Sequence, residues 1–162
     1  MSDAASVEIR EAATKNDVAM TRSLFLEYAR SLDFSLCFQG FDEELATLPG
    51  AYGPPDGQLL LAFSGSEAAG CVGVRPTGTA EAEMKRLYVR PEFRGYALGR
   101  RLAEKAVAFA RDADYAVLRL DTIAESMAAA ERLYREMGFV ETPPYYDNPV
   151  PGATYYALDL KR

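Results

Sequence analysis

Residues 83–99 constrain the fold of this 162-residue chain more than any other segment. Apolar side chains predict an extended strand in the first part of the segment, and a strongly helical run begins at residue 100. The short loop between them holds Arg94, Gly95 and Gly99. A strand, a glycine-containing turn and a helix N-terminus form a phosphate cradle, because the first N–H groups of a helix lack partners and the helix dipole is positive there. The segment therefore predicts a polyphosphate site.

The distribution of charge supports this prediction. Four arginines surround the loop, namely Arg90, Arg94, Arg100 and Arg101, although the whole chain carries a net charge of −6. An acidic chain is a poor ligand for nucleic acid, so we expect no nucleic-acid partner. A local basic cluster on such a chain indicates a site for a polyanion. A solvated helix face is the alternative for Arg100 and Arg101.

Sequence motifs narrow the choice of polyphosphate. The chain has no Gly-Lys pair, which excludes the nucleotide P-loop, and the dinucleotide fingerprint Gly-x-Gly-x-x-Gly is absent. Residues 94–99 read Arg-Gly-x-Ala-x-Gly instead. This pattern resembles the Arg/Gln-x-x-Gly-x-Gly/Ala loop of the GNAT N-acetyltransferase superfamily, which holds the pyrophosphate of acetyl-coenzyme A. Residues 128–139 are similar to the Ala-x-x-Leu-Tyr-x-x-x-Gly-Phe motif of the same superfamily.

The two matches occur in the right order and cover most of residues 81–141. Two positions depart from the family pattern. Ala97 stands where the family usually has Gly, so a Cβ is present where the backbone approaches the coenzyme. Met127 stands where many members carry Asn, which removes a polar contact to the coenzyme.

The resemblance implies an α/β fold of the GNAT type, with a central mixed, mostly antiparallel sheet of about six to seven strands flanked by about four helices. Residues 1–162 are expected to form a single N-acetyltransferase domain. Periodicity and turn residues predict the boundaries of the elements. The predicted strands are 7–11, 58–64, 68–76, 81–89, 115–121, 139–141 and 154–160. The predicted helices are one capped by Asn16 or Asp17 and ending near Ser31, then 41–48, 98–112 and 125–137, the last ended by Gly138.

Composition is typical of a small intracellular enzyme. Apolar residues make up 49% and charged residues 26% of the chain, which is near the globular average. The first residues lack a signal segment, and no apolar run approaches the length of a membrane span, so we expect a cytoplasmic protein without a membrane partner. Cys37 and Cys71 lie outside any metal or redox spacing, and no metal site is expected. We expect a monomer or a homodimer.

The absence of histidine excludes several mechanisms. Ser-His-Asp catalysis, Cys-His catalysis and His-ligated zinc sites all require it. Acid–base chemistry must therefore use a carboxylate, Tyr, Lys, Cys or ordered water.

The resemblance assigns the coenzyme site to the central strand and the loop after it. Leu87 and Val89 are expected to contact the pantetheine arm through their main-chain groups, while their side chains are ordinary core residues. The full set of coenzyme-binding positions implied by the resemblance is Leu87, Tyr88, Val89, Arg94, Gly95, Tyr96, Ala97, Leu98, Gly99 and Arg100.

Acetyl transfer from a thioester to an amine requires a protonated leaving thiolate. Tyr134 matches the family Tyr that donates this proton in several members. A purely structural role is the alternative, because Tyr134 shares a predicted helix face with Met127, Ala130 and Met137.

The reaction also requires an amine free of its proton. Glu83 lies eleven residues before Arg94, the spacing of the general base in the histone acetyltransferase branch of the superfamily. The alternative for Glu83 is a solvent-exposed ion pair at the strand edge with Lys85 or Arg86. Asp121 is a second candidate, either as the base or as a contact to a cationic substrate, and a chain of water molecules is the third.

The acceptor is expected to bind between residues 24–48 and 142–153, with Asp121, Phe38 and Tyr145 as its contacts. An aromatic wall with a negative charge would suit a cationic amine, and its candidate members are Phe34, Phe38, Phe41, Tyr145, Tyr146 and Asp147. We therefore expect an enzyme that moves an acetyl group from acetyl-coenzyme A, its cosubstrate, to a primary amine of a small molecule or peptide by direct attack. The alternatives are an inactive acyl-coenzyme A-binding regulatory domain and an interaction module whose arginines bind another anion.

Overall fold

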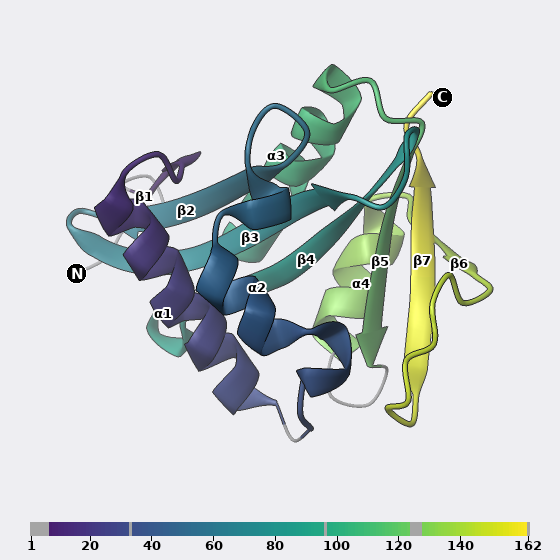
Figure 1. Ribbon diagram of the computed structural model, residues 1–162, viewed down its shortest axis with the longest axis horizontal. Coiled ribbons are helices and arrows are strands. Elements are labelled where there is room, and N and C mark those ends of the chain that lie inside the picture. The colour runs from purple at the N-terminus through teal and green to yellow at the C-terminus, as the bar shows by residue number, and fades with distance from the viewer. Residues whose placement is uncertain (1–6, 33, 96, 124–127, 162) are drawn as a thin grey trace.

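The computed structural model describes residues 7–32, 34–95, 97–123 and 128–161. Its centre is a seven-stranded sheet with the strand order β1-β2-β3-β4-β5-β7-β6 (Figure 1). The strands are β1 (Val7–Glu11), β2 (Gln58–Ser64), β3 (Glu67–Pro76), β4 (Glu81–Val89), β5 (Val117–Ile123), β6 (Val140–Thr142) and β7 (Ala153–Asp159). Among the described strands, only β4 and β5 pair in parallel. The predicted mixed, mostly antiparallel sheet is therefore confirmed.

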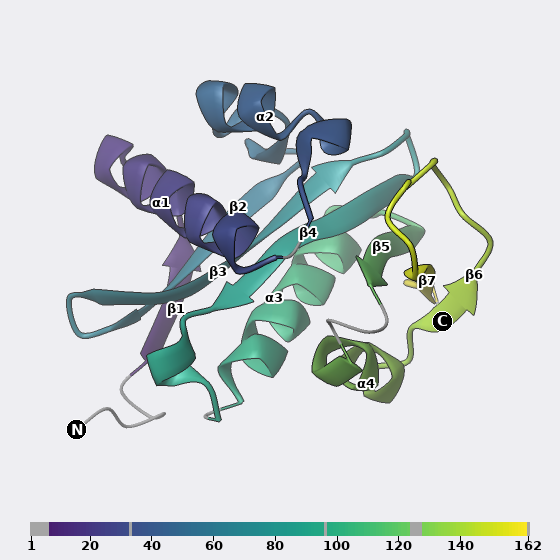
Figure 2. The same ribbon diagram turned by 90° about the horizontal axis from the view of Figure 1, so that it is seen from below.

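Helices cover both faces of the sheet (Figure 2). On one face lie α1 (Lys15–Ser31) and α2 (Phe41–Thr47), and on the other lie α3 (Leu98–Asp112) and α4 (Ala128–Glu136). Short 3₁₀ turns are η2 (Cys37–Gln39), η3 (Gly50–Tyr52) and η4 (Pro91–Phe93). Each pair of helices buries its own apolar cluster against the sheet. Among the described helices, none is long and apolar enough to cross a membrane.

The start of α1 differs from the prediction. Thr14, and not Asn16 or Asp17, is the N-cap. Its hydroxyl accepts a hydrogen bond from the Asp17 N–H at 3.0 Å, and the Asp17 carboxylate accepts one from the Thr14 N–H at 3.2 Å. Asp17 is thus the third helical residue of a capping box, which satisfies two N–H groups that a bare helix end would leave unpaired.

Two helix ends explain why the following strands begin later than predicted. The Tyr115 N–H bonds to the Ala110 carbonyl of α3 at 3.1 Å, so Tyr115 closes the helix and β5 starts at Val117. The Phe139 N–H bonds to the Tyr134 carbonyl of α4 at 3.0 Å, beside Gly138 at φ +100°. This left-handed glycine ends α4 as predicted. The predicted start of α4 lies outside the described residues.

The sheet opens beside β4. Its parallel pairing with β5 is limited, in the described chain, to the three residues 81–83. Its register with β3 shifts between Cys71 and Gly73, where β4 carries an additional residue. Arg86 lies in this bulge with φ +62°, a left-handed conformation that is unfavourable for a residue with a Cβ. Beyond Glu83 the two strands diverge, and the gap between them exposes main-chain groups of β4.

Candidate functional site

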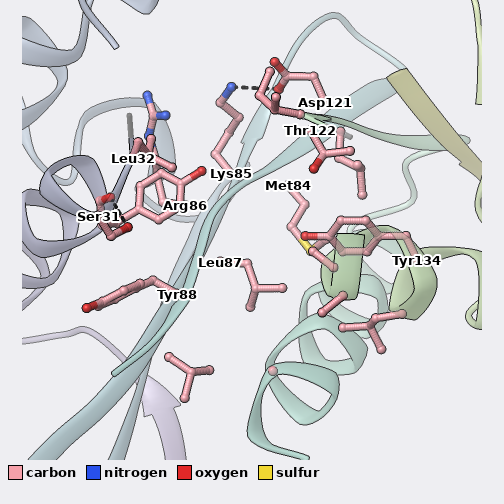
Figure 3. A pocket seen from close by; sticks show the side chains of 18 of the residues that line it. Ser31, Leu32, Met84, Lys85, Arg86, Leu87, Tyr88, Asp121, Thr122 and Tyr134 are labelled. Atoms are coloured by element: carbon pink, nitrogen blue, oxygen red, sulfur yellow. Dashed lines mark hydrogen bonds and ion pairs between the residues drawn. The ribbon is translucent and has the colours of Figure 1, made fainter. Parts of the chain in front are cut away.

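A cavity of about 680 Å³ occupies the gap between β4 and β5 (Figure 3). Residues 84–89 of β4 form one wall, and residues 120–123 of β5 form part of the other. Side chains of α4 and of the C-terminal end of α1 complete the lining. The splayed strands thus create a site with main-chain groups on one side and helix side chains on the other.

One end of the cavity lies at the glycine loop. Arg94 and Gly99 line it, together with Leu87, Tyr88 and Val89. The Arg94 guanidinium donates to the Val89 carbonyl at 2.9 Å and lies 5.9 Å from the centre of the Tyr88 ring. This contact places one exposed cation next to the main-chain groups of β4.

The loop is wound so that α3 begins at its end. Gly95 has φ +91°, and Ala97, the N-cap of α3, has φ +57°. A left-handed residue with a Cβ costs about 1–2 kcal/mol, so Ala97 carries strain that the family Gly would avoid. The α3 N-terminus, with its positive dipole end, follows directly at Leu98. The loop therefore retains the geometry of an anion site despite Ala97.

The predicted coenzyme positions separate into groups. Leu87, Tyr88, Val89, Arg94 and Gly99 line the cavity, and Gly95 and Ala97 form the turn. The side chain of Leu98 is in the apolar core instead. Arg100 is on the face of α3 with Glu104 and Glu136 as ion-pair partners at 3.6 and 3.2 Å. Tyr96 and Met127 lie outside the described residues.

The four arginines do not form the single cluster that the sequence suggested. Arg90 donates to the Glu27 carboxylate of α1 at 2.9 Å, and Arg101 donates to the Val7 carbonyl at 3.2 Å. Arg100 is paired as described above. Among these four side chains, Arg94 lines the cavity. The correction follows from tertiary contacts: distant carboxylates lie beside Arg90 and Arg100, and a main-chain carbonyl of β1 lies beside Arg101.

Tyr134 lies on α4 at the middle of the cavity wall (Figure 3). Its ring packs against Phe139 with the ring centres 5.8 Å apart. No described residue bonds to its hydroxyl, which borders the cavity. Burial raises the pKa of Tyr134, so the hydroxyl keeps its proton at neutral pH. The side chain both packs in the core and presents a protonated donor to the cavity.

The other end of the cavity is a wall of buried charged groups. The Lys85 ammonium lies 3.2 Å from the Asp121 carboxylate. The Arg86 guanidinium donates to the Glu44 carboxylate at 3.0 and 2.9 Å and to the Gln39 side-chain oxygen at 2.7 Å. Both cationic side chains are nearly inaccessible to bulk solvent, at 4% and 2% exposure. We refer to Lys85, Arg86, Asp121, Glu44 and Gln39 as the ionic wall.

The segment 143–152 closes over this wall. The Tyr146 hydroxyl donates to the Asp121 carboxylate and accepts a hydrogen bond from Gln39 at 2.9 Å. The Asn148 side-chain amide donates to the same carboxylate at 2.9 Å. The turn before α2 and the segment before β7 are therefore joined beside the ionic wall.

Hydrogen bonding sets the protonation of the ionic wall. Burial alone would raise the pKa of Asp121, but the Lys85 ammonium and the bonds from Tyr146 and Asn148 outweigh it, and the pKa lies below its ordinary value. Burial lowers the pKa of Lys85 by more than the neighbouring Asp121 and Glu83 carboxylates raise it. Asp121 is thus ionised at neutral pH and is a weak base.

Glu83 lies away from the cavity lining. Its carboxylate accepts bonds from the Arg75 guanidinium at 2.7 Å and from the Tyr145 hydroxyl at 2.9 Å. The alternative of an exposed pair with Lys85 or Arg86 is wrong, because Glu83 is buried and has other partners. Its assignment as the general base stays a prediction.

The predicted aromatic wall is only partly assembled. Phe34 and Asp121 line the cavity, whereas Tyr145 is bound to Glu83 and Asp147 is exposed. The Arg86 guanidinium stacks over the buried Phe41 ring at 5.1 Å. The side chain of Phe38 lies outside the described part of the chain.

Lys85, Arg86, Gln39 and Asn148 line the cavity and were not among the predicted site residues. The available signal was the adjacent pair Lys85 and Arg86 in the middle of a strand that the sequence places at the centre of the fold. Charged residues in the middle of a central strand are rarely buried without a specific reason.

The chain matches the acetyltransferase (GNAT) family over residues 21–139, more than half of its length. It belongs to this family. An N-acetyltransferase of Schizosaccharomyces pombe that is described as uncharacterised is 38% identical over 159 residues, covering 97% of each chain. An acetyltransferase structure from Streptococcus agalactiae superposes with a TM-score of 0.78 at 21% identity, covering 95% of this chain and 98% of that one. A Salmonella typhimurium structure with acetyl-CoA bound gives a TM-score of 0.73 at 21% identity, covering 96% and 94%.

Family membership makes the chain an N-acetyltransferase that uses acetyl-coenzyme A as its cosubstrate. The two structural neighbours support the fold. The residues present fit the coenzyme, since a left-handed loop, a helix N-terminus and Arg94 meet beside the exposed main chain of β4. No cluster of His, Cys, Asp or Glu in the described residues is arranged to hold a metal ion.

Proposed function

We propose that this acetyltransferase moves the acetyl group of acetyl-coenzyme A to a primary amine of a small molecule by direct attack. The observation that supports this most is the cavity between β4 and β5, which joins the glycine loop at one end to the ionic wall at the other. Such a continuous site accommodates a thioester and an amine at the same time.

The coenzyme would lie along β4. The main chain of Gly95–Gly99 and the α3 N-terminus suit the pyrophosphate, and Arg94 adds a positive charge. Main-chain groups of Leu87 and Val89 face the gap and would hold the pantetheine arm and polarise the thioester carbonyl. Donors fixed before the reaction stabilise the developing oxyanion without reorganisation.

The amine nitrogen attacks the thioester carbon, and the C–S bond of the resulting tetrahedral intermediate then breaks. The products are an N-acetyl amine and the free thiol of the coenzyme. Tyr134 would donate its proton to the departing sulfur, because its hydroxyl is protonated and borders the cavity.

The proton of the amine requires a separate acceptor. Asp121 lines the cavity, but its carboxylate already accepts bonds from Lys85, Tyr146 and Asn148, which favours a water molecule as the first proton acceptor. Glu83 would act only if it exchanged its bonds to Arg75 and Tyr145. Glu83→Gln distinguishes these routes: a pH profile of kcat/KM that overlays that of the unmodified enzyme rules Glu83 out.

The test is thermal unfolding with acetyl-coenzyme A, followed by thiol release with a panel of amines. At a coenzyme concentration of about 100 times Kd, binding adds about 2.7 kcal/mol of stability. This raises Tm by about 5–11 °C for a chain of this length. Stabilisation without thiol release would favour an inactive acyl-coenzyme A-binding domain, and no stabilisation would favour another anion ligand.

A further inference from the structure

We propose that the amine acceptor also carries a carboxylate, which Lys85 and Arg86 bind in the ionic wall. The acceptor would thus be an amino acid, with its amine toward the thioester and its carboxylate toward the wall. This inference rests on the proposed function and adds the class of the acceptor.

Arg86 is held rigidly with part of its hydrogen-bonding capacity unused. A guanidinium has five N–H donors. Within the described residues, three hydrogen bonds engage this group, two to Glu44 and one to Gln39. Glu44 lies outside the cavity lining, whereas Arg86 is part of it. The Glu44 carboxylate therefore holds the guanidinium in place, and two of its five N–H donors have no hydrogen bond among the described residues.

The Lys85 ammonium also has N–H donors that make no hydrogen bond in the described structure. An ammonium has three N–H donors, and its one hydrogen bond in the described structure is to Asp121. Asp121 in turn accepts bonds from Lys85, Tyr146 and Asn148, so little of its accepting capacity remains. The cavity wall thus offers more donors than acceptors. A carboxylate supplies acceptors without donors, and charge-assisted bonds to it are among the strongest in proteins.

The balance of charge within the ionic wall favours an acceptor without net charge. Lys85 with Asp121 and Arg86 with Glu44 form two ion pairs whose charges cancel. A polyamine would bring several positive charges to a buried wall whose own charges already balance, which is costly at low dielectric. An amino acid brings one charge of each sign, or one negative charge once the amine has lost its proton.

The position of the wall relative to Tyr134 indicates how the acceptor would lie in the cavity. Gln39 and Tyr146 are bonded to each other and join the segments on either side of the wall. Figure 3 shows Lys85 and Asp121 at one side of the cavity and Tyr134 further along it. A carboxylate at Lys85 and an amine near Tyr134 would therefore belong to one molecule that lies along the cavity.

The first experiment uses the unmodified enzyme and a matched acceptor series. Thiol release from acetyl-coenzyme A is measured with α-, β- and γ-amino acids, with the amide of each, and with a linear polyamine. The amide keeps the amine and the shape of the amino acid but removes the negative charge of its carboxylate. We expect kcat/KM for at least one amino acid to exceed that of its amide by at least about tenfold, the effect of one charge-assisted hydrogen bond.

The second experiment assigns this preference to the wall. Lys85→Met should reduce the ratio between acid and amide by about tenfold or more, while KM for acetyl-coenzyme A stays unchanged. Lys105→Met makes the same replacement at an exposed position of α3 and should leave the ratio intact. Should Lys85→Met fail to fold, Lys85→Arg keeps the charge but alters the reach, and it should change which member of the series is preferred.

The outcomes separate the two proposals. Acetylation of amides or polyamines as fast as amino acids would overturn the inference and leave the proposed function standing. Coenzyme binding without thiol release for any amine would overturn the proposed function. An acid preference that survives in folded Lys85→Met and Lys85→Arg would remove this residue from acceptor recognition.

Discussion

The two ends of the cavity are built in different ways. The coenzyme end is formed by residues close in sequence, from Leu87 to Gly99, and much of it is main chain. The ionic wall is formed by side chains from α2, β4, β5 and the turn before α2, each held by another. A main-chain site depends on local conformation and tolerates side-chain change. A side-chain wall depends on all its partners and can differ between relatives with the same fold.

The substitution with the largest expected loss of unfolding free energy is Arg86→Met, which tests the side-chain wall. The substitution leaves the buried Glu44 carboxylate without its main partner, and breaking such a pair costs about 3–5 kcal/mol of unfolding free energy. Urea unfolding of the coenzyme-free protein measures this loss. The matched control is Arg100→Met, whose exposed ion pairs contribute about 1 kcal/mol or less. If the two variants lost similar unfolding free energy, the buried pair of the ionic wall would contribute no more than an exposed ion pair.

Tyr134→Phe tests the point where the two ends meet. The ring and its packing on Phe139 remain, whereas the proton donor is lost. We expect kcat to fall by about 100-fold or more, with Tm and coenzyme affinity near those of the unmodified enzyme. Tyr115→Phe, which removes a hydroxyl that is not part of the cavity lining, serves as the control for loss of a tyrosine hydroxyl. A lower Tm with full turnover per folded molecule would limit Tyr134 to a structural role.

Arg94→Glu probes the coenzyme end alone. Reversal of this charge should abolish most of the stabilisation of about 2.7 kcal/mol given by acetyl-coenzyme A at about 100 times Kd. The stability of the free protein should change by no more than about 0.5 kcal/mol, since Arg94 is exposed. Thermal unfolding with and without coenzyme measures both quantities. Arg132→Glu makes the same charge change on the exposed face of α4, and an equal effect there would point to non-specific electrostatics.

The smallest effect concerns Asp17, which lies at neither end of the cavity. Hydrogen bonds from Arg10 and from the Ala13 N–H hold the pKa of this carboxyl below its ordinary value. Because the folded state lowers the pKa, the contribution of Asp17 is complete above the unfolded pKa of about 4 and is lost as pH falls below it. Asp17→Asn should therefore cost about 1 kcal/mol at neutral pH and progressively less in acid. Urea unfolding at about pH 7 and about pH 2.5 measures the change. A difference that is constant with pH would show that the charge of Asp17 is irrelevant.

The contrast between the two ends of the cavity also explains which features could be predicted from the sequence. The strand, the glycine loop and the start of α3 are local features, so the loop around Arg94 and Gly99 could be predicted from the residue pattern and the family resemblance. Helix-terminating contacts of Tyr115 and Phe139 shifted the predicted strands by one or two residues, because those contacts depend on the folded backbone. Cap chemistry likewise moved the start of α1 to Thr14.

The ionic wall could not be predicted because its partners are far apart in sequence. Glu44 and Arg86 are 42 residues apart, and Lys85 and Asp121 are 36 residues apart. A strand with alternating charges is normally assigned to a half-exposed face. Only the packing of α2 and of the segment before β7 shows that both cations of β4 are buried.

The hydrogen bond between Gln39 and Tyr146 has a consequence for engineering. It ties the N-terminal segment and the C-terminal segment into one unit, although 107 residues separate them in sequence. A chimera that imports only one of these segments from a relative would leave Asp121, Gln39 or Tyr146 with a mismatched neighbour. Transplanting both together preserves the match, so the chain divides for recombination into an exchangeable pair of flanks and a central coenzyme-binding cassette.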